Sequence, residues 1–138
     1  MEPTAAEEAI RSRIARVGRI TFAEFMETAL YHPEGGYYAQ GSAFGEGGDY
    51  FTSPSAHPAF GTLIALQLRE MWRVLGRPAT FHVVEMGAGD GILATDVLDF
   101  SKMNSDGFEE ALVYIAVDRF LHSIPRNGPR INRIESDA

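Results

Sequence analysis

Glycines and carboxylates alternate in one short run of the sequence, Glu85-Met86-Gly87-Ala88-Gly89-Asp90-Gly91. An apolar run of strand length, residues 81–86, leads into it, and a helical pattern begins at Ile92. Glycine tolerates positive φ and lets a ligand approach the backbone closely, and the free N–H groups at the start of the following helix attract anionic groups. The pattern therefore predicts that a small polar ligand binds at this turn.

The spacing of the glycines narrows the class of ligand. A dinucleotide site requires Gly-x-Gly-x-x-Gly, but here Gly91 comes one residue early and Ile92 occupies the position of the third glycine. The pattern acid-x-Gly-x-Gly-x-Gly instead suits S-adenosylmethionine. The turn then lies beside the methionine end, and Glu85 receives its ammonium group directly or through water. Asp118, at the end of a second strand, is placed to accept hydrogen bonds from the ribose hydroxyls. The predicted cofactor-binding residues are Glu85, Gly87, Ala88, Gly89, Gly91 and Asp118.

Two alternatives remain open for these residues. The glycines would also suit a tight turn that binds no ligand, and an acid at a strand end is often only solvated or caps a helix.

No metal site is expected, because the sequence has no cysteine and its four histidines lack ligand spacing. His57 is interpreted as a helix cap, and Trp72 as a core residue.

The remaining pattern predicts the elements that hold this turn. Capping-box spacing at Thr4 and Thr21 opens two helices, and Pro58 opens a third, well-buried helix that ends before Gly76. A glycine-aromatic loop is expected over residues 34–58. A strand at 81–86, a helix from Ile92 to about Met103 and a strand at 112–117 form one βαβ unit, which predicts an α/β fold with a parallel sheet.

Composition restricts the classes of partner. The 138 residues carry 12 Lys and Arg against 19 Asp and Glu, a formal charge of −7, which does not favour nucleic-acid binding. No apolar run is long enough to cross a bilayer, and the N-terminal residues lack the apolar centre of a secretory signal. The sequence therefore favours a cytoplasmic protein with no membrane partner.

Three blocks of the sequence, within residues 20–117, together resemble the MidA-type methyltransferase family. The blocks are ITFAEFMETALYHPEGGYY, GDYFTSPSAHPAFGTLIALQLREMW and VVEMGAGDGILATDVL. Mitochondrial members of this family assist the assembly of respiratory complex I. The resemblance implies a class I, Rossmann-like fold, S-adenosylmethionine as cofactor and protein arginine as methyl acceptor. It also implies that Glu85, Gly87 and Gly89 bind the cofactor.

The resemblance further implies that a loop closes over the cofactor or the substrate. The loop residues are Asp49, Tyr50, Phe51, Thr52, Ser53 and Pro54. For a eukaryotic protein, the resemblance implies the mitochondrial matrix as location. The alternative is a non-catalytic interaction or assembly module.

The resemblance stops directly after Val117. The family continues with a Val-Glu-Pro-Ser-Pro-x-Leu run, and deleting one base from codons for a similar run reproduces residues 117–127. A shifted reading frame is therefore our hypothesis for the tail, and a naturally short or excised domain is its rival. The predicted division is a helical region with the glycine-aromatic loop at 1–78, the start of the Rossmann-like domain at 79–118 and an irregular tail at 119–138.

A sheet limited to its first βαβ unit has consequences for activity and association. The sequence predicts a truncated domain with two strands, no full active site and little catalysis by itself. The catalytic residues stay unknown. Because the far edge of the first strand would be unpaired, we expect a homodimer formed through this exposed edge.

Overall fold

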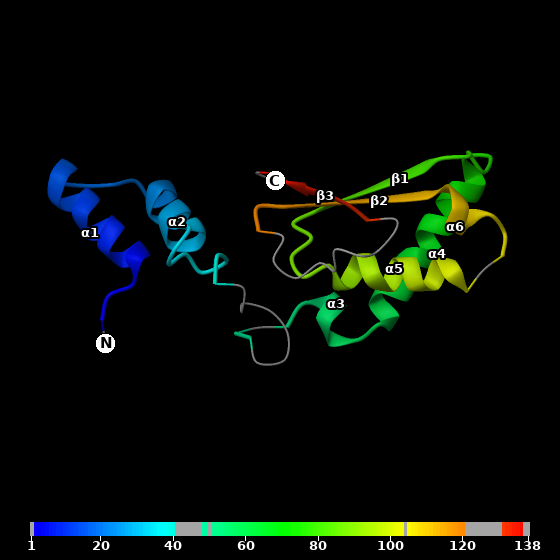
Figure 1. The fold of residues 1–138 in the computed structure, drawn as a ribbon, viewed down its shortest axis with the longest axis horizontal. Helices are drawn as coiled ribbons and strands as arrows, with labels where there is room; N and C mark the ends of the chain where they lie inside the picture. The colour runs from blue at the N-terminus through cyan, green and yellow to red at the C-terminus, as the bar shows by residue number, and fades with distance from the viewer. Residues whose placement is uncertain (1, 41–47, 50, 104, 121–130, 137–138) are drawn as a thin grey trace. The chain divides into compact units, whose positions relative to one another are not determined.

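The computed structural model describes residues 2–40, 48–49, 51–103, 105–120 and 131–136 (Figure 1). Residues 2–40 with 48–49 form one compact unit, and the described residues from 51 onward form a second. The elements in chain order are α1 (Ala5–Val17), α2 (Phe22–Tyr31), α3 (Ser53–Ala56), α4 (Ala59–Val74), β1 (Phe81–Met86), α5 (Ile92–Lys102), α6 (Phe108–Ala111), β2 (Leu112–Asp118) and β3 (Ile131–Glu135).

Two capped helices make up most of the first unit. Thr4 accepts a hydrogen bond from the Glu7 N–H at 3.2 Å at the start of α1, and Thr21 and Glu24 form a complete capping box at the start of α2. Arg13 of α1 forms an ion pair with Glu24, which ties the two helices together. The helices predicted from the caps and the apolar spacing are confirmed.

The second unit contains a parallel three-stranded sheet in the order β1-β2-β3. The register places Val83 beside Tyr114 and Glu85 beside Ala116. Because the strands are parallel, the carboxyl ends of β1 and β2 lie at the same end of the sheet. The turn after Met86 and the side chain of Asp118 therefore lie next to each other.

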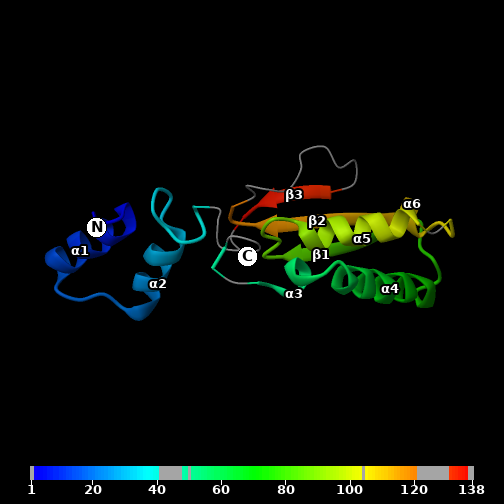
Figure 2. The same ribbon diagram turned by 90° about the horizontal axis from the view of Figure 1, so that it is seen from below.

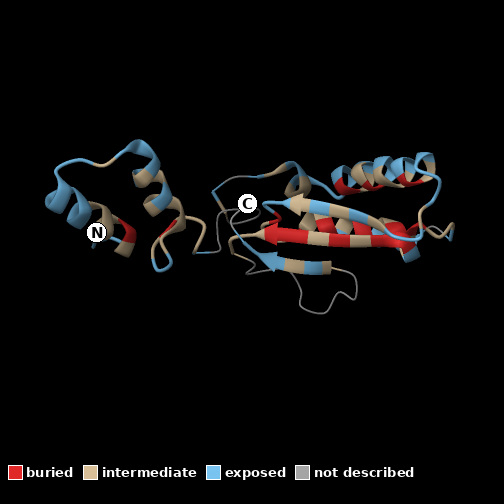
Figure 3. Ribbon diagram, turned by 90° about the horizontal axis from the view of Figure 1, so that it is seen from above, coloured by how far each residue is buried: buried red, intermediate tan, exposed pale blue. Residues whose placement is uncertain are grey.

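The helices α3, α4 and α5 lie on one face of this sheet (Figures 1 and 2). Trp72 of α4 is 3% exposed, as predicted for a core residue, and its indole N–H donates to the Pro78 carbonyl at 2.9 Å. The strand β2 is the most buried of the three strands (Figure 3). The main core consists of Ala65, Trp72, Ala94, Val97, Leu98, Phe108, Ala111, Leu112 and Tyr114.

The segment after β2 contains a strand that the sequence pattern did not reveal. Residues 131–135 form β3 and pair with β2 from Tyr114 to Asp118. The prediction of an irregular tail over 119–138, and of a two-stranded sheet, is wrong at these residues, whereas 121–130 lie outside the described residues. Ile131 and Ile134 are three positions apart, so no two-residue alternation marks this strand. The shifted reading frame stays a prediction.

The helix α4 belongs to the sheet unit, although the predicted boundary after residue 78 grouped it with the N-terminal helices. The compact units divide near residue 51 instead, because α4 packs against α5. A short helix, α3, lies within the loop expected over residues 34–58, and a second short helix, α6, lies directly before β2, where no element was predicted. A helix of four residues is too short to show an apolar period.

The helix α4 is also less buried than its apolar sequence predicted. Ala65 is fully buried, but Leu63 and Val74 keep 64% and 78% of their surface exposed. Within the described second unit, α5 is the main neighbour of α4, so only one side of the helix is covered. The prediction of a well-buried helix is therefore wrong for its outward side.

Candidate cofactor-binding site

The turn between β1 and α5 has the backbone conformation that its glycines predict. Gly87, Gly89 and Gly91 have φ angles of 71°, 54° and 74°, values that residues with a Cβ atom rarely adopt. The N–H groups of Gly87 and Ala88 both donate to the Val117 carbonyl, at 2.9 and 3.1 Å. These bonds hold the turn against the carboxyl end of β2.

A pocket of about 160 Å³ opens beside this turn. Four of the six predicted cofactor-binding residues line it, together with two residues of the predicted covering loop and two residues that were not predicted. The lining residues are Thr52, Pro54, Glu85, Gly87, Ala88, Gly89, Asp90 and Leu93. The structure thus brings the predicted turn and part of the predicted loop to one site.

The other two predicted cofactor residues, Gly91 and Asp118, lie next to the pocket lining. Gly91 is buried at the N-cap of α5. Asp118 accepts hydrogen bonds through Oδ2 from the Gly89 N–H at 2.8 Å and through Oδ1 from the Phe120 N–H at 3.0 Å. Asp118 therefore stabilises the turn from the end of β2, and its contact with ribose hydroxyls stays a prediction.

The predicted covering loop divides between the two units. Asp49 belongs to the first unit, where it interacts with the Tyr37 hydroxyl, and Tyr50 lies outside the described residues. In the second unit Phe51 is 68% exposed. The closing role of the loop stays a prediction.

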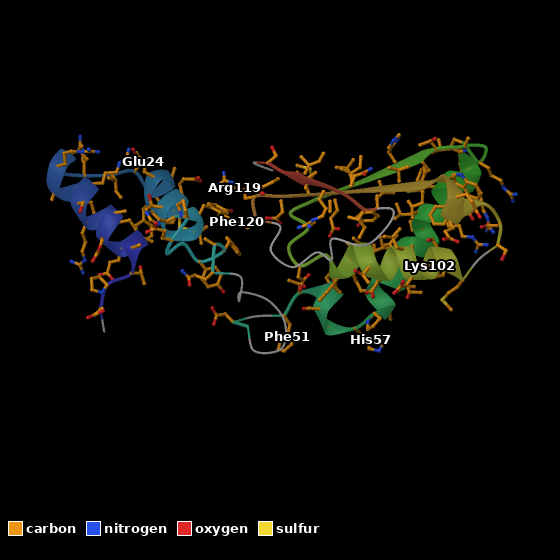
Figure 4. All side chains as sticks on the ribbon, in the orientation of Figure 1. Glu24, Phe51, His57, Lys102, Arg119 and Phe120 are labelled. Atoms are coloured by element: carbon orange, nitrogen blue, oxygen red, sulfur yellow. The ribbon has the colours of Figure 1, made fainter. Side chains whose placement is uncertain are left out.

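The rest of the predicted loop forms the helix α3 and its flanks. Thr52 and Ser55 make a capping box around Ser53 and Pro54, which directs Thr52 and Pro54 to the pocket. His57 follows the carboxyl end of α3, and Phe51 precedes its amino end, so the two residues lie on opposite sides of this helix (Figure 4). The Nδ1 of His57 accepts a hydrogen bond from the Ala59 N–H at 3.0 Å, which confirms the predicted helix cap.

The Glu85 carboxylate is partly buried and receives a hydrogen bond from the core. The Tyr114 hydroxyl donates to Glu85 Oε2 at 2.9 Å. Burial raises the pKa of Glu85, the Tyr114 hydrogen bond lowers it, and the charges of Asp90 and Asp118 raise it, so the pKa lies above its ordinary value. Burial and the adjacent Glu85 charge also raise the pKa of Tyr114, so its hydroxyl stays a donor.

Three residues of the site were missed by sequence reasoning: Asp90, Leu93 and Tyr114. Asp90 Oδ1 accepts a hydrogen bond from the Ile92 N–H at 3.2 Å and so caps α5. An aspartate two residues before a helix is a signal that could have identified this cap. Leu93 and Tyr114 carry no such local signal, because their contacts depend on the helix orientation and on the strand register.

The residues present fit the amino-acid end of S-adenosylmethionine. Glu85 supplies a carboxylate for an ammonium group, and a Cβ atom added at Gly87 would meet no heavy atom within 4 Å, so the space beside that glycine is open. Pockets for drug-sized ligands enclose about 300–1,000 Å³. The described lining therefore encloses part of such a molecule rather than all of it.

Within the described ranges, no three His, Asp or Glu side chains are grouped as they would be around a metal ion. The helices of the same ranges are all too short or too polar to cross a membrane.

Comparison with known proteins agrees with this geometry. Residues 63–121 match the family described as "Putative S-adenosyl-L-methionine-dependent methyltransferase". A crystal structure from Burkholderia thailandensis, a "likely methyl transferase" bound to S-adenosyl-homocysteine, matches with a TM-score of 0.76 and 27% identity. The match covers 96% of this chain and 37% of that one. The second unit therefore has the fold of a Rossmann-like methyltransferase.

Curated relatives give the same result at the level of sequence. The Drosophila melanogaster "Protein arginine methyltransferase NDUFAF7 homolog, mitochondrial" is 38% identical over 112 residues, which are 81% of this chain and 26% of the relative. The human "Protein arginine methyltransferase NDUFAF7, mitochondrial" is 38% identical over 86 residues, 62% of this chain and 20% of the relative. The resemblance to the MidA-type methyltransferase family that the sequence blocks predicted is confirmed. The chain spans about a quarter or less of the length of these relatives.

Proposed function

We propose that this chain binds S-adenosylmethionine at the turn between β1 and α5, as the cofactor-binding part of a methyltransferase. The observation that carries the proposal is the pocket in which the Glu85 carboxylate meets a turn of left-handed glycines. The similar structure from Burkholderia thailandensis, bound to S-adenosyl-homocysteine, supports it. When bound, S-adenosylmethionine supplies an electrophilic methyl group on a sulfonium centre.

Each residue of the site has a binding role in this proposal. Glu85 accepts hydrogen bonds from the ligand ammonium, and Gly87 leaves the space in which the amino-acid end lies. Leu93 and Pro54 line the pocket and offer apolar contact to that end. Asp118 holds Gly89 in position and, as predicted, accepts from the ribose hydroxyls.

We propose protein arginine as the methyl acceptor of the whole enzyme. The names of the fly and human relatives support this choice. Because the pocket encloses only part of a cofactor-sized molecule, we expect weak cofactor binding and slow methyl transfer by these 138 residues alone. A non-catalytic interaction or assembly module, such as one acting on respiratory complex I, is the weaker alternative, because the relatives are named methyltransferases.

The other partners and the location are part of the same proposal. The formal charge of −7 supports the absence of a nucleic-acid partner. We propose a homodimer formed through the edge of β1 that no other described strand covers. We also propose a cytoplasmic location, or the mitochondrial matrix for a eukaryotic protein. The word "mitochondrial" in the names of the fly and human relatives supports the second location.

Two glycine variants test cofactor binding by calorimetric titration of S-adenosylmethionine. Gly87→Val places a side chain in the pocket and should weaken binding at least tenfold. Gly76→Val is the matched control, because Gly76 also has a positive φ, 84°, and open space around it but lies away from the pocket. Both variants should lose about 1–2 kcal/mol of stability from backbone strain. Unchanged binding in Gly87→Val, or no binding by the wild type, would reject the site.

A further inference from the structure

We propose that Tyr114 is a positioning residue for the cofactor: its hydroxyl holds one oxygen of the Glu85 carboxylate, so that the other oxygen stays available to the ligand ammonium. The inference rests on the proposed function, because it assigns a cofactor contact to Glu85. It deepens that function by adding a residue outside the pocket lining.

The geometry of Tyr114 suits a fixed donor. Its side chain is 2% exposed and belongs to the main core, where Ala94, Val97 and Leu98 of α5 also lie. The register places Tyr114 beside Val83, two residues before Glu85 on the same face of β1. The phenol ring is therefore held by packing, and the distance of 2.9 Å from its hydroxyl to Glu85 Oε2 is set by the sheet.

The described part of the chain gives Glu85 one hydrogen-bond donor, and that donor is Tyr114. The other titratable groups that act on Glu85 are Asp90, in the turn, and Asp118, at the end of β2, and both oppose its ionisation. Burial opposes it as well. Tyr114 is therefore the group that favours the ionised carboxylate, the form that can accept hydrogen bonds from an ammonium group.

Removal of the hydroxyl should affect both the affinity and its dependence on pH. Tyr114→Phe keeps the ring but leaves Glu85 Oε2 without its donor, and the pKa of Glu85 then rises further. We expect Tyr114→Phe to bind S-adenosylmethionine about ten- to a hundredfold more weakly at pH 7, the cost of one hydrogen bond to a charged group. As the pH falls from 7 to 5, Glu85 becomes protonated and cofactor binding should be lost, and in Tyr114→Phe this loss should occur at a higher pH than in the wild type. The α-ammonium of the ligand stays protonated throughout this range.

A double-mutant cycle separates positioning from a purely structural role. Glu85→Gln should bind weakly and without dependence on pH between 5 and 7. In the Glu85→Gln background, Tyr114→Phe should change the affinity less than about twofold, because the carboxylate that it positions is absent. An equal loss in both backgrounds, or a Tyr114→Phe variant with wild-type affinity and pH profile, would overturn the inference.

The wild type is titrated first, so that the two proposals can fail separately. Absence of binding by the wild type rejects the proposed function and this inference together. If the wild type binds and Tyr114→Phe binds with the same affinity and pH profile, only the inference is rejected. If circular dichroism shows that Tyr114→Phe does not fold, carbon-13 resonances of the wild type replace it. The Tyr114 Cζ and Glu85 carboxyl shifts should then titrate with one midpoint, and independent midpoints would overturn the inference.

Discussion

Glu85 is a carboxylate in a place where burial and two neighbouring acids disfavour its charge. Burial, Asp90 and Asp118 raise its pKa, and the Tyr114 hydrogen bond offsets only part of that effect. The folded chain therefore binds the Glu85 proton more tightly than the unfolded chain does. Protonated Glu85 contributes its full stabilisation of the fold below the pKa of the unfolded chain, and this contribution is lost as the pH rises through the pKa of the folded chain. An ionised Glu85 therefore lowers stability at neutral pH, as is common for a group kept for binding.

At the scale of this residue, Glu85→Gln should stabilise the fold while it weakens cofactor binding. We expect a gain of up to about 1 kcal/mol at pH 7, which disappears near pH 4, where Glu85 is protonated in the wild type. Urea unfolding at the two pH values measures it. Glu110→Gln, an exposed glutamate of α6, is the control and should change stability by less than about 0.5 kcal/mol. A loss of stability in Glu85→Gln at pH 7 would contradict this account.

The site residues that sequence reasoning identified are those whose role is local. Gly87 and Gly89 follow from the need for positive φ between a strand and a helix, and Glu85 follows from its place before them. Tyr114 could not be found in this way, because its contact with Glu85 crosses two strands and depends on the register Val83↔Tyr114. A residue 29 positions away along the chain is brought near only by folding.

At the scale of elements, α4 and α5 approach each other closely, and α5 begins at the pocket. A Cβ atom at Gly61 of α4 would lie 2.3 Å from Asp96 Cβ and 2.7 Å from Asp96 Oδ2. Asp96 Oδ2 is buried and has no hydrogen-bond partner among the described residues. Gly61 therefore permits a contact between the helices that no larger residue permits.

Gly61→Ala should destabilise the second unit. Overpacking costs about 1–3 kcal/mol, and replacing glycine inside a helix recovers at most about 1 kcal/mol. Because the contact is with a Cβ atom, which rotation of χ1 cannot move, we expect a net loss of about 1–2 kcal/mol in urea unfolding. Leu63→Ala, at an exposed position of the same helix, should change stability by less than about 0.5 kcal/mol. Equal stability of the two variants would argue against a tight interface.

Long elements with clear boundaries were predictable, and short or weakly patterned ones were not. Capping residues and apolar spacing predicted α1 and α2, and the apolar run before the glycines predicted β1. The strand β3 was missed because main-chain pairing with β2, and not side-chain alternation, defines it. The exposure of Leu63 and Val74 was missed because apolar spacing shows that a helix can be buried but does not show how many neighbours it has.

At the scale of the whole molecule, the free edge of β1 and the exposed side chains beside it predict self-association. Val84 and Met86 of β1 are 56% and 59% exposed, and the sheet order leaves β1 at one edge among the described strands. Exposed apolar edges of small sheets recruit further strands. Sedimentation velocity at micromolar concentration should show a dimer that Val84→Lys weakens. Val74→Lys, on the exposed side of α4, should leave it intact, and a wild-type monomer would contradict the prediction.

The central claim, that S-adenosylmethionine binds at the turn between β1 and α5, is tested most directly by nuclear magnetic resonance. Titration of the nitrogen-15-labelled chain should shift the amide resonances of Gly87, Ala88 and Leu93 along one saturable curve. The resonances of α1, in the other compact unit, serve as the internal reference and should stay unchanged. Saturable shifts confined to residues away from this turn, or no saturable shift at millimolar S-adenosylmethionine, would contradict the claim.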